Sequence, residues 1–366
     1  MREKVNLVLV CNQAWTIYKS RIEILSELSK RNYIVSVVSE DSYNADNHQC
    51  IQRKQFSNSL LNTINAIYSF FLYLNSFKGK NVVFILYSTK ANLLYGFLLR
   101  VRGFKYICVV AGLGKLYGLN RLARYLLIKA YAVVTSAAQG VQVLNSHDHN
   151  VFSRFVKKEK LYRLNCEGFS VAAGASPEYA LSKKIIMVSR LIREKGVFQY
   201  LNAVKILRDL GVGVDYNFYL IGKYDATHMI DNNKIRELSL QANVILIEGA
   251  VDITHYIQNM DCFVFPSLYN EGMPRVLFEA VEHGSYIITS DQPGCADFID
   301  YGFVGQIIKT SMSFFEETLA QEIHAYIKLP TEEKYAVKKH NAGLAPLIGD
   351  VSRVIEVYER IIKKCT

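Results

Sequence analysis

Several kinds of segment are missing from this 366-residue sequence. The most apolar window, Ile67 to Leu74, is far shorter than the ~20 residues that a membrane-spanning helix needs. The first residues lead directly into a strand-length apolar run and do not resemble a signal peptide. The seven cysteines are scattered and have no Cys-x-x-Cys spacing, which argues against disulfides and zinc sites. We therefore expect a protein of a reducing, cytoplasmic compartment.

Proline is also scarce, with six in all, and the first of them is Pro177. It lies in the segment 166–181, which has two glycines and little helical or strand periodicity. A helical pattern after Asp350 carries a single apolar stripe, and this C-terminal helix could pack back on the N-terminal domain. We expect an N-terminal domain (1–168), a linker (169–182), a C-terminal domain (183–345) and a C-terminal helix (346–366).

The length and the 50% of apolar residues allow two domains, each with its own core. Short apolar runs alternate with helical patterns along the whole chain. The runs that we interpret as strands are 5–10, 34–38, 82–86, 106–110, 185–188, 218–221, 244–247, 262–265 and 286–289. This alternation predicts the α/β class, with parallel sheets covered by helices on both faces. We expect two doubly wound, Rossmann-like domains that face each other across a cleft.

Acidic residues are few in the front half of the chain. Residues 1–180 contain 23 Lys and Arg against 10 Asp and Glu, or +13, whereas the remainder has 20 against 23, or −3. Basic residues between Lys78 and Lys129 are interleaved with aromatic and aliphatic ones. Such a face could bind nucleic acid or an anionic membrane, where each Lys or Arg contributes about 1 kcal/mol. Because no nucleic-acid motif accompanies it, we expect a membrane surface; a solvated basic face is the alternative.

The segment 266–284 connects a short apolar strand to a helical pattern that ends at Gly284. Pro274 marks the helix start, because proline is favoured at the first helical position. The free amides at that terminus would bind phosphate. Glu271 lies before the terminus and Glu279 lies eight residues later, where each carboxylate could meet hydroxyl groups. Phosphate between hydroxyl-rich groups indicates a nucleotide sugar, although either glutamate alone could be a solvated surface acid.

The pattern Pro-Ser-x-x-x-Glu-Gly-Met-Pro-Arg-Val-Leu-x-Glu-Ala in this segment resembles the two-glutamate signature of family 4 retaining glycosyltransferases. A second stretch, Ser189 to Gly196, follows a strand directly and resembles the second signature of the family. Its Arg190 and Lys195 are well placed to grip a diphosphate, the arginine as a fork and the lysine as a point charge. Gly222 ends another strand at the same predicted edge.

The resemblance implies a GT-B fold and transfer of a hexose or N-acetylhexosamine, with retention, from a nucleotide sugar, for which UDP is the commoner carrier. Arg190 and Lys195 would stabilise the leaving diphosphate together with two helix amides. Glu271 would orient the donor sugar, and Glu279 would hold the ribose. The donor-binding residues implied are Gly222, Gly272, Met273, Pro274, Arg275, Val276 and Glu279.

Other resemblances concern the acceptor and one further loop. Gly112 and Gly114 lie in a stretch similar to the Thr-Gly-Leu-Gly loop of bacterial surface-polysaccharide members. Lys90 ends a run, Tyr-Ser-Thr-Lys, that stands where family members often carry a His. The stretch Thr289 to Asp297 is similar to their Asp-x-Pro-Gly-Cys-Arg-Glu loop, but Ala296 and Asp297 depart from it. The subgroup implies an undecaprenyl-diphosphate-linked saccharide acceptor in O-antigen or capsule assembly. It further implies a peripheral protein on the cytoplasmic face of the inner membrane.

No Asp-x-Asp motif occurs, so we expect a reaction without metal or other cofactor. The alternatives are a nucleotide-sugar 2-epimerase of the same fold and a non-catalytic protein that binds nucleotide or lipid. The glycines from Gly112 to Gly118 have the wrong spacing for a dinucleotide-binding fingerprint. His147 and His149 resemble a metal pair, but no third ligand is evident.

Overall fold

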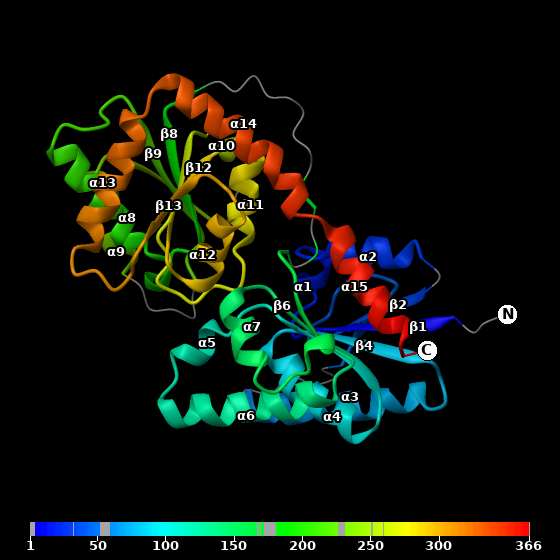
Figure 1. Ribbon diagram of the computed structural model, residues 1–366. Helices are drawn as coiled ribbons and strands as arrows, with labels where there is room; N and C mark the ends of the chain where they lie inside the picture. The colour runs from blue at the N-terminus through cyan, green and yellow to red at the C-terminus, as the bar shows by residue number, and fades with distance from the viewer. Residues whose placement is uncertain are drawn as a thin grey trace. The chain divides into compact units, whose positions relative to one another are not determined.

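The computed structural model describes residues 4–31, 33–51, 59–166, 168, 170–171, 181–225, 231–249, 252–258 and 260–365. The chain divides into two compact units, one formed by Met1–Ser170 with Asp350–Thr366 and the other by Val171–Gly349 (Figure 1). Pro177 and most of the predicted linker lie outside the described residues. The predicted boundary at 346 falls inside a helix, α14 (Thr331–Ile348).

Unit 1 is built on a parallel sheet of seven strands in the order β3-β2-β1-β4-β5-β6-β7. The strands are β1 (Val5–Val10), β2 (Tyr33–Ser39), β3 (His48–Cys50), β4 (Val82–Tyr87), β5 (Lys105–Val110), β6 (Gly140–Val143) and β7 (Leu161–Arg163). All six residues of β4 are buried, as expected for a strand covered on both faces.

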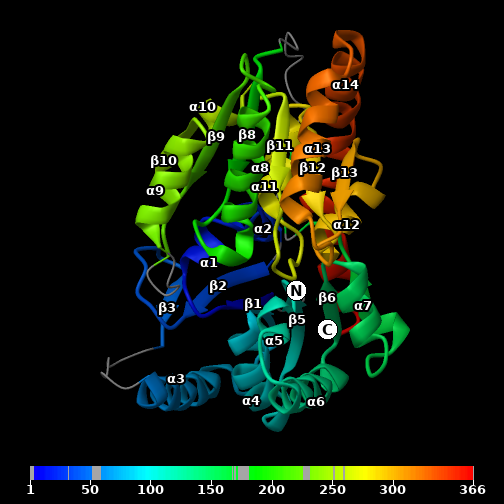
Figure 2. The same ribbon diagram turned by 90° about the vertical axis from the view of Figure 1, so that its left-hand side faces the viewer.

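Helices cover both faces of this sheet, and α3, α4 and α6 lie side by side on one of them (Figure 2). The helices are α1 (Trp15–Tyr18), α2 (Ile22–Ser29), α3 (Ser59–Leu74), α4 (Gly96–Val101), α5 (Gly114–Tyr117), α6 (Arg121–Ala137), α7 (Ser146–Phe152) and α15 (Val351–Lys363). The 3₁₀ turns are η1 (Asn75–Phe77) and η3 (Lys158–Lys160), and η2 (Ala91–Tyr95) is a π-helix.

Helix α15 packs on unit 1 although it follows unit 2 in the sequence. Its Tyr358 is fully buried, and the hydroxyl donates to Gln142 Oε1 at 2.7 Å. Arg31 of the first unit forms an ion pair with Glu359 at 2.8 Å. The last helix is therefore part of the core of the first sheet.

Unit 2 is built on a parallel sheet of six strands in the order β10-β9-β8-β11-β12-β13. The strands are β8 (Lys184–Val188), β9 (Asn217–Gly222), β10 (Val244–Glu248), β11 (Cys262–Phe265), β12 (Tyr286–Ser290) and β13 (Gly305–Ile308). The chain winds outward from β8 in one direction and then continues from β11 in the other. The boundary between β8 and β11 is therefore the topological switch point, where ligands bind in such sheets.

A buried ion pair anchors the helices of unit 2. Lys338 of α14 lies 3.1 Å from Asp261, which precedes β11, and both side chains are 2% exposed. The carboxylate also accepts hydrogen bonds from the amides of Ser182 and Lys183, before β8. The helices are α8 (Val197–Asp209), α9 (Asn232–Gln241), α10 (Thr254–Ile257), α11 (Arg275–Glu282), α12 (Pro293–Asp300), α13 (Phe315–Lys328) and α14, with a 3₁₀ turn η4 (Arg193–Lys195).

The predicted α/β class and two Rossmann-like parallel sheets are confirmed. Each of the nine predicted strands is present, with bounds within one residue. None of the helices in the described part of the chain is both long and apolar enough to cross a membrane.

Candidate active site

A cavity of about 410 Å³ opens in unit 2 at the switch point between β8 and β11. Val188 and Phe265, the last residues of these two strands, form part of its wall. Its remaining lining comes mainly from the loops that leave them, including Arg190, Lys195 and Glu271. The N-terminus of α11 completes it with Pro274, Arg275, Val276 and Glu279. The structure thus brings together seven of the residues that the sequence predicted.

The loop after β8 packs tightly against the loop after β11, and Gly196 permits this contact. Gly196 adopts φ +77°, and a Cβ placed on it would lie 2.0 Å from the carbonyl oxygen of Pro266. The backbone amide of Leu268 donates to the carbonyl of Glu194 at 2.8 Å. These contacts fix the position of Lys195, the residue before the glycine.

Lys195 and Glu271 form an ion pair with little exposure, 12% and 10% for the two side chains. The hydroxyl of Ser267, itself fully buried, donates to the same Glu271 Oε1 at 2.7 Å. The Lys195 ammonium also lies 5.4 Å from the ring centre of Phe265 and 5.5 Å from that of Tyr269, within cation–π range. Burial, and then the Glu271 carboxylate, raises the pKa of Tyr269, so this ring stays neutral beside the pair.

Helix α11 directs its N-terminus into the cavity. Pro274 occupies the N-cap position with ψ 114°, and the helix begins at Arg275, one residue later than predicted. The extended ψ of Pro274 is what excludes it from the helix. The amides of Arg275 and Val276 are the first two of the helix, and the third, that of Leu277, donates to the Pro274 carbonyl at 3.1 Å. This terminus adds a partial positive charge to the cavity wall.

The other charged lining residues are in ion pairs of their own. Arg190 donates to Asp225 Oδ2 at 2.7 Å and is half exposed. Arg275 donates from Nε to Glu279 Oε1 at 3.0 Å, one helical turn apart. A guanidinium has five N–H donors, so each pair leaves donors of the arginine for a ligand.

Gly222, Gly272 and Met273 lie beside the cavity, outside the set of lining residues. A Cβ on Gly222 would lie 1.9 Å from the carbonyl oxygen of Ser189, so glycine is required for β9 to approach the turn after β8. Met273 is buried, with 6% exposure. Gly222 therefore shapes the backbone next to Arg190.

A third loop, after β12, packs against the loop that carries Glu271. The hydroxyl of Ser290 donates to the carbonyl of Ser267 at 2.5 Å. A Cβ on Gly294 would lie 2.2 Å from the carbonyl oxygen of Gly272, so the start of α12 also packs directly on this loop. The sequence alone predicted no role for Ser267, Ser290 or Gly294. The signal for Gly294 was its Pro-Gly pair shortly after a predicted strand, where α12 begins; the serines offered no such signal.

The residues predicted for the acceptor side lie in unit 1, at the C-terminal edge of its sheet. Gly112, with φ +128°, and Gly114 follow β5, and Lys90 follows the neighbouring strand β4. Lys90 forms an ion pair with Glu40 at 2.6 Å, and the same carboxylate accepts from the Tyr95 hydroxyl at 2.6 Å. Glu40 and Tyr95 were not predicted from the sequence.

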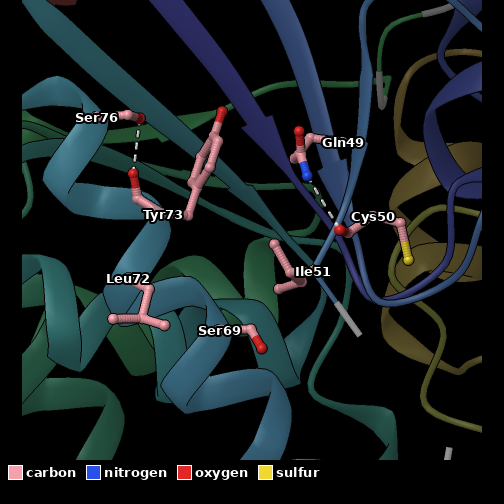
Figure 3. A pocket seen from close by; sticks show the side chains of 7 residues that line it. All are labelled: Gln49, Cys50, Ile51, Ser69, Leu72, Tyr73 and Ser76. Carbon is pink, nitrogen blue, oxygen red and sulfur yellow. Dashed lines mark hydrogen bonds between the residues drawn. The ribbon is translucent and has the colours of Figure 1, made fainter. Parts of the chain in front are cut away.

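A further cavity of about 390 Å³ lies in unit 1 between α3 and the end of β3 (Figure 3). Its lining includes Gln49, Cys50, Ser69 and Tyr73 and no charged side chain. It therefore lacks the charged groups that make the switch-point cavity a candidate for chemistry. Within the described ranges, no three His, Cys, Asp or Glu side chains are grouped to hold a metal ion.

Comparison with known proteins agrees with this geometry. The family of group 1 glycosyl transferases matches residues 174–342, which lie within unit 2 and contain every residue of the switch-point cavity. The chain therefore carries a domain of this family within unit 2. It is a glycosyltransferase, and its switch-point cavity lies in the matched domain.

Two relatives illustrate the similarity. A Campylobacter jejuni protein named N,N'-diacetylbacillosaminyl-diphospho-undecaprenol alpha-1,3-N-acetylgalactosaminyltransferase is 26% identical over 95% of this chain and 96% of its own length. The capsular polysaccharide biosynthesis glycosyltransferase CapM of Staphylococcus aureus is 30% identical over 33% of this chain and 31% of its own.

Solved structures show the same fold. A glycosyltransferase from Rickettsia africae has a TM-score of 0.75 at 15% identity, with 99% of each chain covered. The Anabaena protein HepE, solved with UDP and glucose, has a TM-score of 0.77 at 12% identity, with 98% of this chain and all of that chain covered. The glycosyltransferase therefore has the GT-B architecture of two Rossmann-like domains.

Proposed function

We propose that this glycosyltransferase moves a hexose or N-acetylhexosamine, with retention, from a UDP-sugar to a saccharide carried on a polyprenyl diphosphate. The observation that carries the donor assignment is the switch-point cavity. Lys195, Arg190 and the N-terminus of α11 supply positive charge to one space, which Glu271 and Glu279 also line. In a nucleotide sugar, the diphosphate lies between a sugar and a ribose, both rich in hydroxyl groups. The cavity offers cations for the diphosphate and two carboxylates for the hydroxyl groups on either side.

The cations of the cavity stabilise the leaving group. As the bond between the sugar and the diphosphate breaks, negative charge grows on the diphosphate oxygens. Lys195 has three N–H donors, so it can bind the diphosphate while it keeps its contact with Glu271. Arg190 and the amides of Arg275 and Val276 add fixed donors, and such preorganised electrostatic stabilisation is commonly the largest catalytic contribution. No step of this proposal requires a metal ion.

The two carboxylates bind hydroxyl groups of the donor. Glu271 is held by Lys195 and Ser267 through Oε1, which orients the carboxylate group toward the donor sugar. Glu279 uses Oε1 for Arg275 and presents its carboxylate one turn further along the helix, for the ribose. Because both carboxylates are fixed by hydrogen bonds, they can select the donor pose.

The acceptor assignment is supported by the name of the Campylobacter jejuni relative, which contains a saccharide on diphospho-undecaprenol. It is also supported by unit 1, whose sequence has no Asp or Glu between Asp46 and Asp148 but twelve Lys and Arg. This acid-free stretch contains α3, α4 and α6. A lipid-linked acceptor would be reached from such a surface.

The face formed by α3, α4 and α6 has the composition of a membrane-binding surface. It exposes large apolar side chains on each helix: Leu60, Ile64, Tyr68, Phe97, Val101, Leu122, Tyr125 and Leu126. Arg102 lies 4.7 Å from the ring centre of Phe71 and so joins α4 to α3, and Arg100 donates to Ser136 of α6. Exposed apolar groups among cations favour an anionic bilayer. These features support our proposal that the protein acts at the cytoplasmic face of the inner membrane.

Product analysis tests the proposal. Nucleoside diphosphate release would be measured with a panel of nucleotide sugars, with and without a short-chain polyprenyl-diphosphate saccharide, in the presence of a chelator. We expect turnover with a UDP-sugar that depends on the acceptor, and a product with the anomeric configuration of the donor. Inversion, a requirement for added divalent metal, or conversion of the sugar without an acceptor would overturn the corresponding part of the proposal.

A further inference from the structure

A third cavity, of about 460 Å³, lies in unit 1 between α6 and α7. Arg124, Lys129 and Arg154 line it together with apolar side chains such as Ile128 and Phe155, and no carboxylate is among the lining groups. In the described part of the chain, none of these three cations forms an ion pair. The cavity therefore combines positive charge without a counter-ion and an apolar wall.

The polar side chains of the cavity are held in place. The Arg124 guanidinium lies 5.4 Å from the ring centre of Tyr117, and the Tyr117 hydroxyl is hydrogen bonded to His147 Nε2. Tyr117 ends α5 and His147 lies in the first turn of α7, so these contacts join three helices. A guanidinium fixed by an aromatic ring keeps its N–H edge available for an anion.

The cavity lies between two surfaces that the acceptor must reach. On one side, α6 also carries Leu122, Tyr125 and Leu126, which belong to the exposed apolar face. On the other side, Asp148 of α7 accepts a hydrogen bond from the amide of Leu113 at 3.2 Å, between Gly112 and Gly114. The cavity thus adjoins both the lipid-facing helix and the C-terminal edge of the sheet.

We propose that this cavity binds the diphosphate group and the first isoprenoid carbons of the polyprenyl carrier. The assignment rests on the proposed function, and it adds the site at which the carrier is recognised. Arginine forks match diphosphate oxygens, while Ile128 and Phe155 contact the hydrocarbon. A free anion would have no use for the apolar wall, and a nucleic acid would not fit a cavity of this size.

The first experiment compares two acceptors that carry the same sugar, one on a polyprenyl diphosphate and one on an uncharged alkyl group, in detergent solution. For Arg124→Ala/Arg154→Ala we expect the KM of the diphosphate acceptor to rise at least tenfold. The KM values of the donor and of the neutral acceptor should stay within twofold of wild type. The matched control is Lys158→Ala, which removes an exposed cation of η3 in the same unit but outside the cavity. Equal changes for both acceptors, or none, would overturn the inference.

A binding measurement separates this inference from the proposed function. Calorimetric titrations would compare farnesyl diphosphate, farnesol and inorganic diphosphate as ligands of the wild-type protein and of the variant Arg154→Glu. The side chain of Arg154 is exposed. We expect farnesyl diphosphate to bind at least tenfold more tightly than the other two and to lose that affinity in the variant. Inorganic diphosphate binding equally well would indicate a free-phosphate site and overturn the carrier assignment. If farnesyl diphosphate binds but no sugar is transferred to the lipid-linked acceptor, the result would contradict the proposed function and would still support the cavity as a binding site for the carrier.

Discussion

Lys195 and Glu271 are 76 residues apart in the sequence, yet their side chains form a nearly buried ion pair at the switch point of the second sheet. Removing one member of a buried pair leaves the other charge without a partner, which commonly costs several kcal/mol. The pair is also joined to the scaffold through Ser267 and through the turn at Gly196. Changes to either residue should therefore affect both stability and turnover.

Glu271→Ala should lower kcat by about 100-fold or more, the usual size of the loss of one preorganised charged group in an active site. Lys195→Met should have a similar effect, and the double variant should be little worse than either single one, because the residues act together. The measurement is nucleoside diphosphate release at saturating donor. The control is Glu194→Gln, which neutralises an exposed acid next to Lys195. Additive losses in the double variant would show that the two residues act independently.

Gly196→Ala should destabilise the protein and reduce turnover, because the new methyl group would meet the Pro266 carbonyl at 2.0 Å. Gly211→Ala is the matched control, since Gly211 has a similar φ, +70° against +77°, and nothing within 4 Å of the added Cβ. Both substitutions place alanine in a left-handed conformation, at a cost of about 1 kcal/mol. Only Gly196→Ala should displace Lys195. Thermal unfolding and kcat would be compared, and equal activity of the two variants would contradict the role of the close contact.

Glu279→Gln should raise the KM for the donor about tenfold with little change in kcat, since a hydrogen bond to a charged group contributes about 1.5 kcal/mol or more. The reason is the proposed ribose contact, which would be equally strong in the ground state and the transition state. Glu282→Gln, on the same helix but outside the cavity lining, is the control. A fall in kcat with unchanged KM would instead assign Glu279 to the reacting end of the donor.

The free energy of unfolding should fall as the pH drops below about 6.5, partly because of His283, which follows the last residue of α11. Burial, and then the nearby charge of Lys338, lowers the pKa of this imidazole from its ordinary value of 6.5. The unfolded chain therefore binds the proton first, and stability present above pH 6.5 is lost as the pH falls toward the folded-state pKa. One proton limits the slope to about 1.4 kcal/mol per pH unit. Urea unfolding of His283→Gln at pH 7.5 and 5.5 should show a smaller loss than wild type; an equal loss would contradict this.

Leu122→Asp/Leu126→Asp should abolish sedimentation with anionic vesicles, because both side chains are exposed on α6, at 69% and 57%. Turnover of a neutral, soluble acceptor should be unchanged. A control pair, Leu210→Asp and Leu240→Asp, alters side chains of unit 2 that are as exposed, at 71% and 82%. Wild-type protein that binds zwitterionic and anionic vesicles alike, or neither, would contradict the assignment of this face.

The sequence was sufficient for the elements with strong local patterns. Apolar runs such as 82–86 predicted buried parallel strands, and the ends of such runs predicted where Arg190, Lys195 and Glu271 would gather. The strands that were missed, β3, β6, β7 and β13, have three or four residues and contain polar residues or glycine, whereas the equally short β11 is apolar throughout and was predicted.

Features that depend on tertiary contacts were not predictable. Gly140 is needed because a Cβ there would lie 2.4 Å from Ile361, a residue of α15 more than two hundred positions away. The same holds for Ser267 and Gly294, whose importance arises only when the loops after β11 and β12 meet. Ser88, with φ +89°, and the π-helix that follows it are likewise irregularities that no periodicity indicates.

Helix α15 also determines the order in which the chain can finish folding. The amide of Val171 donates to the carbonyl of Gly349 at 2.8 Å, so the first and last residues of unit 2 lie side by side. Unit 2 is thus an insertion in unit 1, and all of its residues are synthesised before residue 350. The first sheet must wait with the surface around Gln142 uncovered until Tyr358 arrives. The domain that is synthesised first is therefore the one whose core closes last.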